Sequence, residues 1–253
     1  MTFRELHNQD SPLLICNVWD VASARMAEKC GYSAIGTSSA AMATQLGFED
    51  GEAMPFTQLY NVVKRIALNT KLPLTVDIEA GYSRDPSVVY DHIVSLGKLG
   101  VSGINIEDSL CDPERKLLDA AAFSELVSYL KAKLVESEQD IFINVRTDTY
   151  LLGLDHALKE TTQRIKLYSA AGADGIFIPC LTESEDIKTL VGISNLPINL
   201  MCMPDLPDFN QLKEIGIKRI SMGNFLFDSM IADLGDRLSK VVSDNSFRNV
   251  FAS

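Results

Sequence analysis

The chain has 253 residues, of which 46% are hydrophobic and 23% charged, a balance typical of a folded protein rather than a disordered one. Its formal net charge of -11 argues against non-specific binding to nucleic acid or anionic membranes. The first ten residues lack a signal-peptide pattern, no apolar run reaches ~18 residues, and the five cysteines have no metal-binding spacing. We therefore predict a cytoplasmic protein with reduced thiols.

Short apolar, β-branched segments alternate along the chain with longer segments of helical period. The eight predicted strands are residues 13–18, 33–37, 73–78, 103–107, 141–146, 174–179, 197–202 and 218–222. The intervening segments, such as 86–99, 119–135 and 154–171, have apolar residues at three- and four-residue spacing and are predicted helices. Four of these segments stop at a glycine, as helices often do: Gly31, Gly100, Gly172 and Gly216.

This alternation predicts a parallel sheet with right-handed crossovers, which either closes into a barrel or stays open as a doubly wound sheet. No glycine-rich phosphate loop follows any predicted strand, as a nucleotide-binding open sheet would require. Eight strand–helix pairs is the number of a barrel. We therefore predict that residues 1–253 form a single α/β domain, a (β/α)8 TIM barrel.

Acidic residues end two neighbouring predicted strands, at the face where a parallel barrel carries its active site. Asp77 and Glu79 stand two apart, so their side chains share a face, and Glu107 ends the next strand. Three converging carboxylates repel one another unless a metal ion or a proton intervenes. Carboxylates with water suit Mg²⁺, with Mn²⁺ as the alternative ion. The competing interpretation is that these acids cap helices, and for Asp108 or Asp148 alone it is equally good.

Arg146 ends the fifth predicted strand. Its planar guanidinium could bind a carboxylate or phosphonate, or it could form a buried ion pair with the acids. Small residues continue from the second strand through Ser38, Ser39 and Ala40, where backbone N–H groups could stabilise an enolate oxygen. Tight packing would explain the same small residues.

Six segments in order resemble the isocitrate lyase/phosphoenolpyruvate mutase superfamily over essentially the whole chain. They are 17–25, 37–52, 76–82, 103–108, 144–148 and 172–179. The resemblance implies that Asp77 binds Mg²⁺ directly, while Asp50, Glu79 and Glu107 act largely through metal-bound waters. It also implies homodimers or homotetramers in which the last helix is exchanged between subunits.

The resemblance further implies a small anionic carboxylate or phosphonate substrate. Ser38 and the backbone of Ser39 and Ala40 would surround its pyruvyl-like end, and Arg146 would hold its acidic substituent. Arg146, Glu107 and Ser38 are the catalytic candidates. Asn199, a further candidate for substrate binding, lies in a segment that resembles a branch of the superfamily with a short lid and no assigned reaction.

The implied reaction is Mg²⁺-dependent cleavage of a C–C bond in a 2-oxo- or 2-hydroxy-carboxylate through an enolate-like pyruvyl or oxalyl intermediate. The alternative is P–C chemistry by a mutase or phosphonopyruvate hydrolase, and a third class is a barrel that binds a metabolite without turnover. Segment 109–118 lacks the thiol motif of the lyases, and Pro179 replaces the histidine of the mutases. We predict that this segment is a mobile, polar lid and that Cys111 within it is not an indispensable nucleophile.

Overall fold

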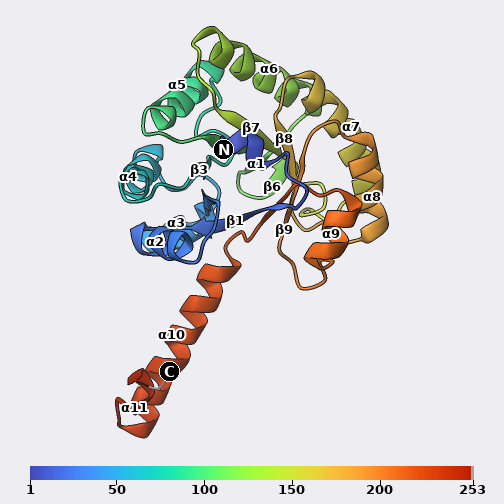
Figure 1. Cartoon of the computed structure of the whole chain (residues 1–253). Helices are drawn as coiled ribbons and strands as arrows, with labels where there is room; N and C mark the ends of the chain where they lie inside the picture. The colour runs from blue at the N-terminus through green and yellow to red at the C-terminus, as the bar shows by residue number, and fades with distance from the viewer. Residues whose placement is uncertain (252–253) are drawn as a thin grey trace.

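The computed structural model describes residues 1–251, and its centre is a closed barrel of eight parallel strands (Figure 1). Each strand lies within its predicted range, so the TIM-barrel prediction is confirmed. Around the barrel the strands are β1 (Leu13–Val18), β2 (Ala34–Thr37), β3 (Leu74–Asp77), β4 (Gly103–Glu107), β7 (Phe142–Arg146), β8 (Gly175–Ile178), β9 (Ile198–Met201) and β10 (Arg219–Ser221). Pairing of Leu13 with Arg219 closes the ring between β1 and β10.

Helices connect the strands and cover the outside of the barrel, except for the last two helices, which project away from it (Figure 1). They are α1 (Phe3–Leu6), α2 (Val21–Lys29), α3 (Ser39–Leu46), α4 (Phe56–Ala67), α5 (Pro86–Gly97), α6 (Ala120–Glu136), α7 (Ala157–Ala170), α8 (Ser184–Ile193), α9 (Phe209–Ile215), α10 (Phe225–Asp244) and α11 (Arg248–Phe251). The four glycines at helix ends all have positive φ, as C-capping requires. Within residues 1–251, no helix is both long and apolar enough to span a membrane.

The small residues that follow β2 begin a helix. The strand ends at Thr37, as predicted, and α3 begins at Ser39. Ser38 is the N-cap, and its Oγ accepts a hydrogen bond from the N–H of Ala41 at 3.3 Å. Alanine favours helix and serine favours the N-cap, so this sequence starts a helix directly at the barrel rim.

The predicted lid has regular structure. Strands β5 (Ser109–Cys111) and β6 (Arg115–Leu117) form a two-stranded antiparallel hairpin outside the barrel sheet. The N–H of Leu118 also donates to the carbonyl of Asp108 at 2.8 Å, which fixes the base of the hairpin. The sequence of this polar segment did not predict the two short strands, because pairing between strands is not a local property. Mobility of the lid remains a prediction.

Helix α1 lies against the barrel and packs Phe3 and Leu6 against Leu13 and Phe142. His7 ends this helix, is 2% exposed, and stacks on Phe142 with ring centroids 4.3 Å apart. Burial, together with the nearby charge of Arg219, lowers the pKa of His7 to about 4. The imidazole is therefore neutral in the folded protein near neutral pH.

This burial predicts that acid destabilises the fold through His7. Its pKa is lower in the folded than in the unfolded chain, so its contribution is fully present above about pH 6.5 and is lost as the pH falls towards 4. Between about pH 7.5 and 5 the loss is about 2 kcal/mol. In urea unfolding, His7→Phe should reduce the fall in stability by that amount, while exposed His156→Gln should not. Equal falls in all three proteins would contradict the assignment.

Candidate active site

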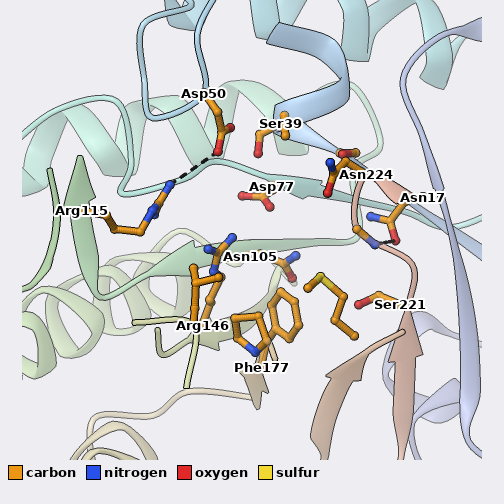
Figure 2. Close-up of a pocket in the computed structure, with 16 residues that line it drawn as sticks. Asn17, Ser39, Asp50, Asp77, Asn105, Arg115, Arg146, Phe177, Ser221 and Asn224 are labelled. Carbon is orange, nitrogen blue, oxygen red and sulfur yellow. Dashed lines mark hydrogen bonds and ion pairs between the residues drawn. The ribbon is translucent and has the colours of Figure 1, made fainter. Parts of the chain in front are cut away.

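A cavity of about 270 Å³ opens at the carboxyl ends of the strands (Figure 2). Its walls come from strand ends, the N-terminus of α3 and the lid hairpin. The lining residues are Asn17, Ser38, Ser39, Ala40, Asp50, Asp77, Asn105, Arg115, Arg146, Leu151, Phe177, Pro179, Met201, Ser221, Gly223 and Asn224. Six of the predicted site residues therefore meet in one cavity.

Asp77 is the last residue of β3 and points into the middle of the cavity (Figure 2). Asp77 is 9% exposed, and its Oδ1 accepts the N–H of Glu79 at 3.0 Å. Burial raises its pKa, although the nearby charge of Arg146 opposes the shift. A buried carboxylate facing a cavity in this way is suited to binding a cation.

Glu79 and Glu107 line a neighbouring cavity of about 320 Å³ rather than the main one. Glu79 accepts hydrogen bonds from the Tyr82 hydroxyl at 2.7 Å and from the N–H of Glu52 at 2.5 Å. Burial raises the pKa of Glu79 to about 7, and that of Glu107 is also raised by burial although two arginines oppose it. Both carboxylates are held away from the centre of the main cavity.

The carboxylates at this rim are better suited to a metal ion that keeps several bound waters than to an ion held by side chains alone. In the part of the chain that the structure describes, no three His, Cys, Asp or Glu side chains are grouped closely enough to hold a metal ion. Mg²⁺ commonly uses one or two carboxylates and keeps several waters. Asp77 could be the direct ligand, with Asp50, Glu79 and Glu107 around it, and a cation would offset the negative charge that burial disfavours.

Arg146 forms the buried ion pairs of one interpretation and also lines the cavity, and its binding of substrate stays a prediction. Its Nε and Nη2 bind the two oxygens of Asp148 at 2.6 and 3.1 Å, and its Nη1 lies 3.1 Å from Glu107 Oε2. The guanidinium also lines the cavity, 5.9 Å from the centre of the Phe177 ring. Glu107 and Asp148 raise the pKa of Arg146 against the effect of burial, so the guanidinium stays charged.

Arg115, on β6 of the lid hairpin, also enters the site, and the sequence did not predict it. Its Nη1 binds Glu107, the hydroxyl of Ser109 at 2.9 Å and Asp148 at 3.2 Å. Its Nη2 lies 3.5 Å from Asp50 across the top of the cavity (Figure 2). The only feature of the sequence that pointed to this role was a basic residue in the lid segment. The direction of its side chain depends on the register of the hairpin, which the sequence did not predict.

The first turn of α3 lies at the cavity, and within residues 1–251 the N–H groups of Ser39 and Ala40 have no hydrogen-bond partner. The N–H groups of Ser39 and Ala40 belong to the first helical turn, where intrahelical acceptors are missing. They carry the positive end of the helix dipole, so an anionic oxygen is favoured there. Ser38 also lines the cavity, although its hydroxyl already accepts the Ala41 N–H.

Asn199 is not brought together with the other predicted residues. It lies inside the barrel, where it donates to Ser221 Oγ at 3.1 Å and accepts from Asn144 at 3.4 Å. Asn144 also donates to Asn105 Oδ1 at 2.9 Å, so a layer of amides supports the floor of the cavity. Arg219 is 1% exposed and donates to the same Asn105 oxygen at 3.2 Å. Burial lowers the pKa of Arg219 to about 9.

Cys111 is exposed and lines the neighbouring cavity, not the main one. Its thiol lies 3.8 Å from the carbonyl of Pro113. Gly51 packs so closely on it that an added Cβ would come within 2.7 Å of Cys111 Cβ, and Gly51 has a φ of 99°. This position favours a packing role for Cys111 between the lid and the Asp50 loop.

The barrel and its acidic rim, together with the family match that follows, identify an enzyme of the isocitrate lyase/phosphoenolpyruvate mutase superfamily. A family model described as phosphoenolpyruvate phosphomutase matches residues 3–242. The chain therefore belongs to the phosphoenolpyruvate mutase family.

Three relatives extend this comparison. An uncharacterized protein of Mycobacterium tuberculosis is 34% identical over 225 residues, which cover 88% of this chain and 82% of the relative. An oxaloacetate decarboxylase of Paraburkholderia xenovorans is 28% identical, with 95% of this chain and 81% of the relative covered. A solved structure from Burkholderia cenocepacia J2315, provisionally called a phosphonomutase, has 35% identity and a TM-score of 0.88, covering 94% of this chain and 97% of its own.

The position of Asp77 predicts that its removal weakens metal binding without unfolding the barrel. In titration calorimetry, Asp77→Asn should lower Mg²⁺ affinity more than about 100-fold, because loss even of a supporting group typically costs 10- to 100-fold. The variant should melt no lower than the unaltered protein without metal, since a buried charge has been removed. Asp10→Asn, at an exposed acid on the N-terminal segment, is the control. Unchanged Mg²⁺ affinity would rule out the assignment.

Proposed function

We propose that the protein is a Mg²⁺-dependent lyase that cleaves a C–C bond in a small 2-oxo- or 2-hydroxy-carboxylate through an enolate-like pyruvyl or oxalyl intermediate. The observation that carries the proposal is the meeting of Asp77, Arg146 and the N-terminus of α3 in one cavity of about 270 Å³. That volume is suited to a metabolite of a few carbon atoms rather than a nucleotide.

Different residues of the chain bind the substrate and stabilise the charge that develops on it. When bound at Asp77, a divalent cation supplies positive charge to the oxygen on which the enolate charge develops. The N–H groups of Ser39 and Ala40 hold the pyruvyl end of the substrate. Arg146 faces the acidic substituent, and Glu107 keeps that guanidinium in position through their 3.1 Å ion pair.

Oxaloacetate is the first substrate to test, because the decarboxylase relative acts on it. In that reaction the C3–C4 bond breaks, its electron pair stays on the pyruvyl fragment as an enolate, and CO₂ leaves. A proton then adds to C3 to give pyruvate. The alternative is P–C chemistry, which the phosphonomutase relative supports.

Turnover in the presence and absence of Mg²⁺ tests the proposal. Pyruvate formation from oxaloacetate and phosphate release from phosphonopyruvate would be measured in parallel, with Asp77→Asn protein in the same buffer to correct for decarboxylation by free metal. We expect pyruvate formation that falls by at least about 100-fold when Mg²⁺ is chelated. Phosphate release, or conversion of phosphonopyruvate to phosphoenolpyruvate, would instead establish the P–C alternative. No turnover of either substrate or of a wider set of 2-oxo and 2-hydroxy acids would indicate a binding protein.

The rate of the Cys111→Ser variant would be measured in the same assay. Since the thiol lies outside the main cavity, its rate should stay within about tenfold of the unaltered protein. A loss beyond about 1,000-fold would establish a thiol acid–base mechanism. The cytoplasmic location remains the prediction made from the sequence.

We also propose that the protein works as a homodimer or homotetramer built around α10. This 20-residue helix projects from the barrel and carries α11 at its far end (Figure 1). Within α10 only Phe227 is buried, whereas an apolar stripe along the helix is exposed: Phe225, Leu226, Met230, Ile231, Leu234, Leu238 and Val242. A helix this exposed needs a partner surface, and exchange of α10 between two copies would supply it.

Molecular mass in solution tests this assembly. The unaltered protein should sediment as a dimer or tetramer, and Leu234→Glu combined with Leu238→Glu should shift it to the monomer, because charges would be buried in an apolar contact. Val135→Glu is the control, at an exposed apolar residue on α6. A monomeric unaltered protein would contradict the proposal.

A further inference from the structure

We infer that Arg115 is a specificity-determining residue that binds the distal carboxylate of the substrate, so that the site selects dicarboxylates. The inference rests on the proposed function and names its substrate class. It concerns the lid hairpin, whose only side chain in the main cavity is Arg115 among the described residues.

One side of the Arg115 guanidinium is fixed and the other is not. Nη1 binds Glu107, Ser109 at 2.9 Å and Asp148 at 3.2 Å, which holds the group at the cavity wall. Nη2 makes one ion pair in the described chain, to Asp50 at 3.5 Å, and Nε makes no hydrogen bond there. The anchored Nη1 leaves Nη2 positioned for a ligand without reorganising the whole side chain.

Exchanging the Asp50 contact for a ligand carboxylate costs little. The contact is long, and the Asp50 side chain is 45% exposed. Ion pairs of this kind contribute little because water screens them and replaces them. A carboxylate inside the cavity would instead meet Nη2 in a partly enclosed site, where a charge-assisted hydrogen bond is stronger.

Arg146 is less free than Arg115 to take this role alone. Each of its three nitrogens already contacts a carboxylate oxygen, at 2.6 and 3.1 Å for Asp148 and 3.1 Å for Glu107. The two guanidiniums share Glu107 and Asp148, so they stand together on one wall of the cavity. The N-terminus of α3 with Ser39 forms another part of the wall (Figure 2). A substrate lying between them would carry one anionic group at each end.

This arrangement links substrate choice to the lid. Arg115 pairs with Cys111 across the β5–β6 hairpin, and the hairpin is otherwise polar and half-exposed. A ligand carboxylate on Nη2 would therefore hold the hairpin over the cavity. A ligand without a distal charge would bind at the pyruvyl end and gain nothing from the lid.

Two probes separate the ends of the site. Oxalate mimics the enolpyruvate end, and 3,3-difluorooxaloacetate adds a distal carboxylate. Their affinities would be measured by calorimetry with Mg²⁺ for the unaltered protein, for Arg115→Ala and for Arg115→Lys. Lys116→Ala, at the exposed neighbour on the same strand, is the matched control.

Arg115→Ala should weaken binding of 3,3-difluorooxaloacetate by about 10- to 100-fold, the worth of a hydrogen bond between charged groups. Its oxalate affinity should change less than about threefold, which also shows that the altered protein is folded with an intact metal site. Arg115→Lys should recover part of the lost affinity, because charge is kept but the planar geometry is lost. Lys116→Ala should bind both probes normally.

Equal losses for both probes would overturn the inference, because Arg115 would then act through the carboxylate cluster. Unchanged affinity for the dicarboxylate would overturn it as well. If the unaltered protein binds neither probe with Mg²⁺, the proposed function itself fails and the inference fails with it. That result is distinguishable from a failure of the inference alone, in which oxalate still binds.

Discussion

The charge balance of buried carboxylates at the barrel rim is the constraint on which the site depends. Closing the sheet brings Asp77, Glu107 and Asp148 to the carboxyl ends of neighbouring strands and removes most of their water. Isolated buried charges are costly, so cations must accompany them. Arg146 and Arg115 supply part of this charge, and the raised pKa of Asp77 shows that its own negative charge remains incompletely offset.

The barrel interior supports this rim with polar layers rather than with apolar packing alone. Asn105, Asn144 and Asn199 hydrogen-bond across strands that are far apart in the chain, and Arg219 lies beneath them. The three asparagines are paired with one another, whereas Nε and Nη1 of Arg219 have no hydrogen-bond partner within residues 1–251. Asn105 lies in the cavity floor, opposite Asp77 in the pairing of β4 with β3.

The lid hairpin and α10 lie outside the barrel, and proteins that share one fold can differ in such segments. The lid hairpin contributes one cation to the cavity, while α10 contributes an apolar surface directed away from it. The lid hairpin is polar and partly exposed, whereas α10 presents exposed apolar side chains. A common barrel with variable lids can therefore serve different substrates without changing the residues at its strand ends.

The sequence by itself determined the eight strands and their order, because strand periodicity is a local property. It also placed Asp77, Arg146 and Ser39 at one rim, because the strands of a parallel barrel all end at the same face. Only the tertiary structure decided that Glu79 and Glu107 face a neighbouring cavity and that Asn199 lies within the barrel. It also decided that Arg115 reaches the site, since side-chain direction there depends on the pairing of β5 with β6 and on carboxylates from other strands. Pairing and charge contacts across the fold leave no periodic trace in the sequence.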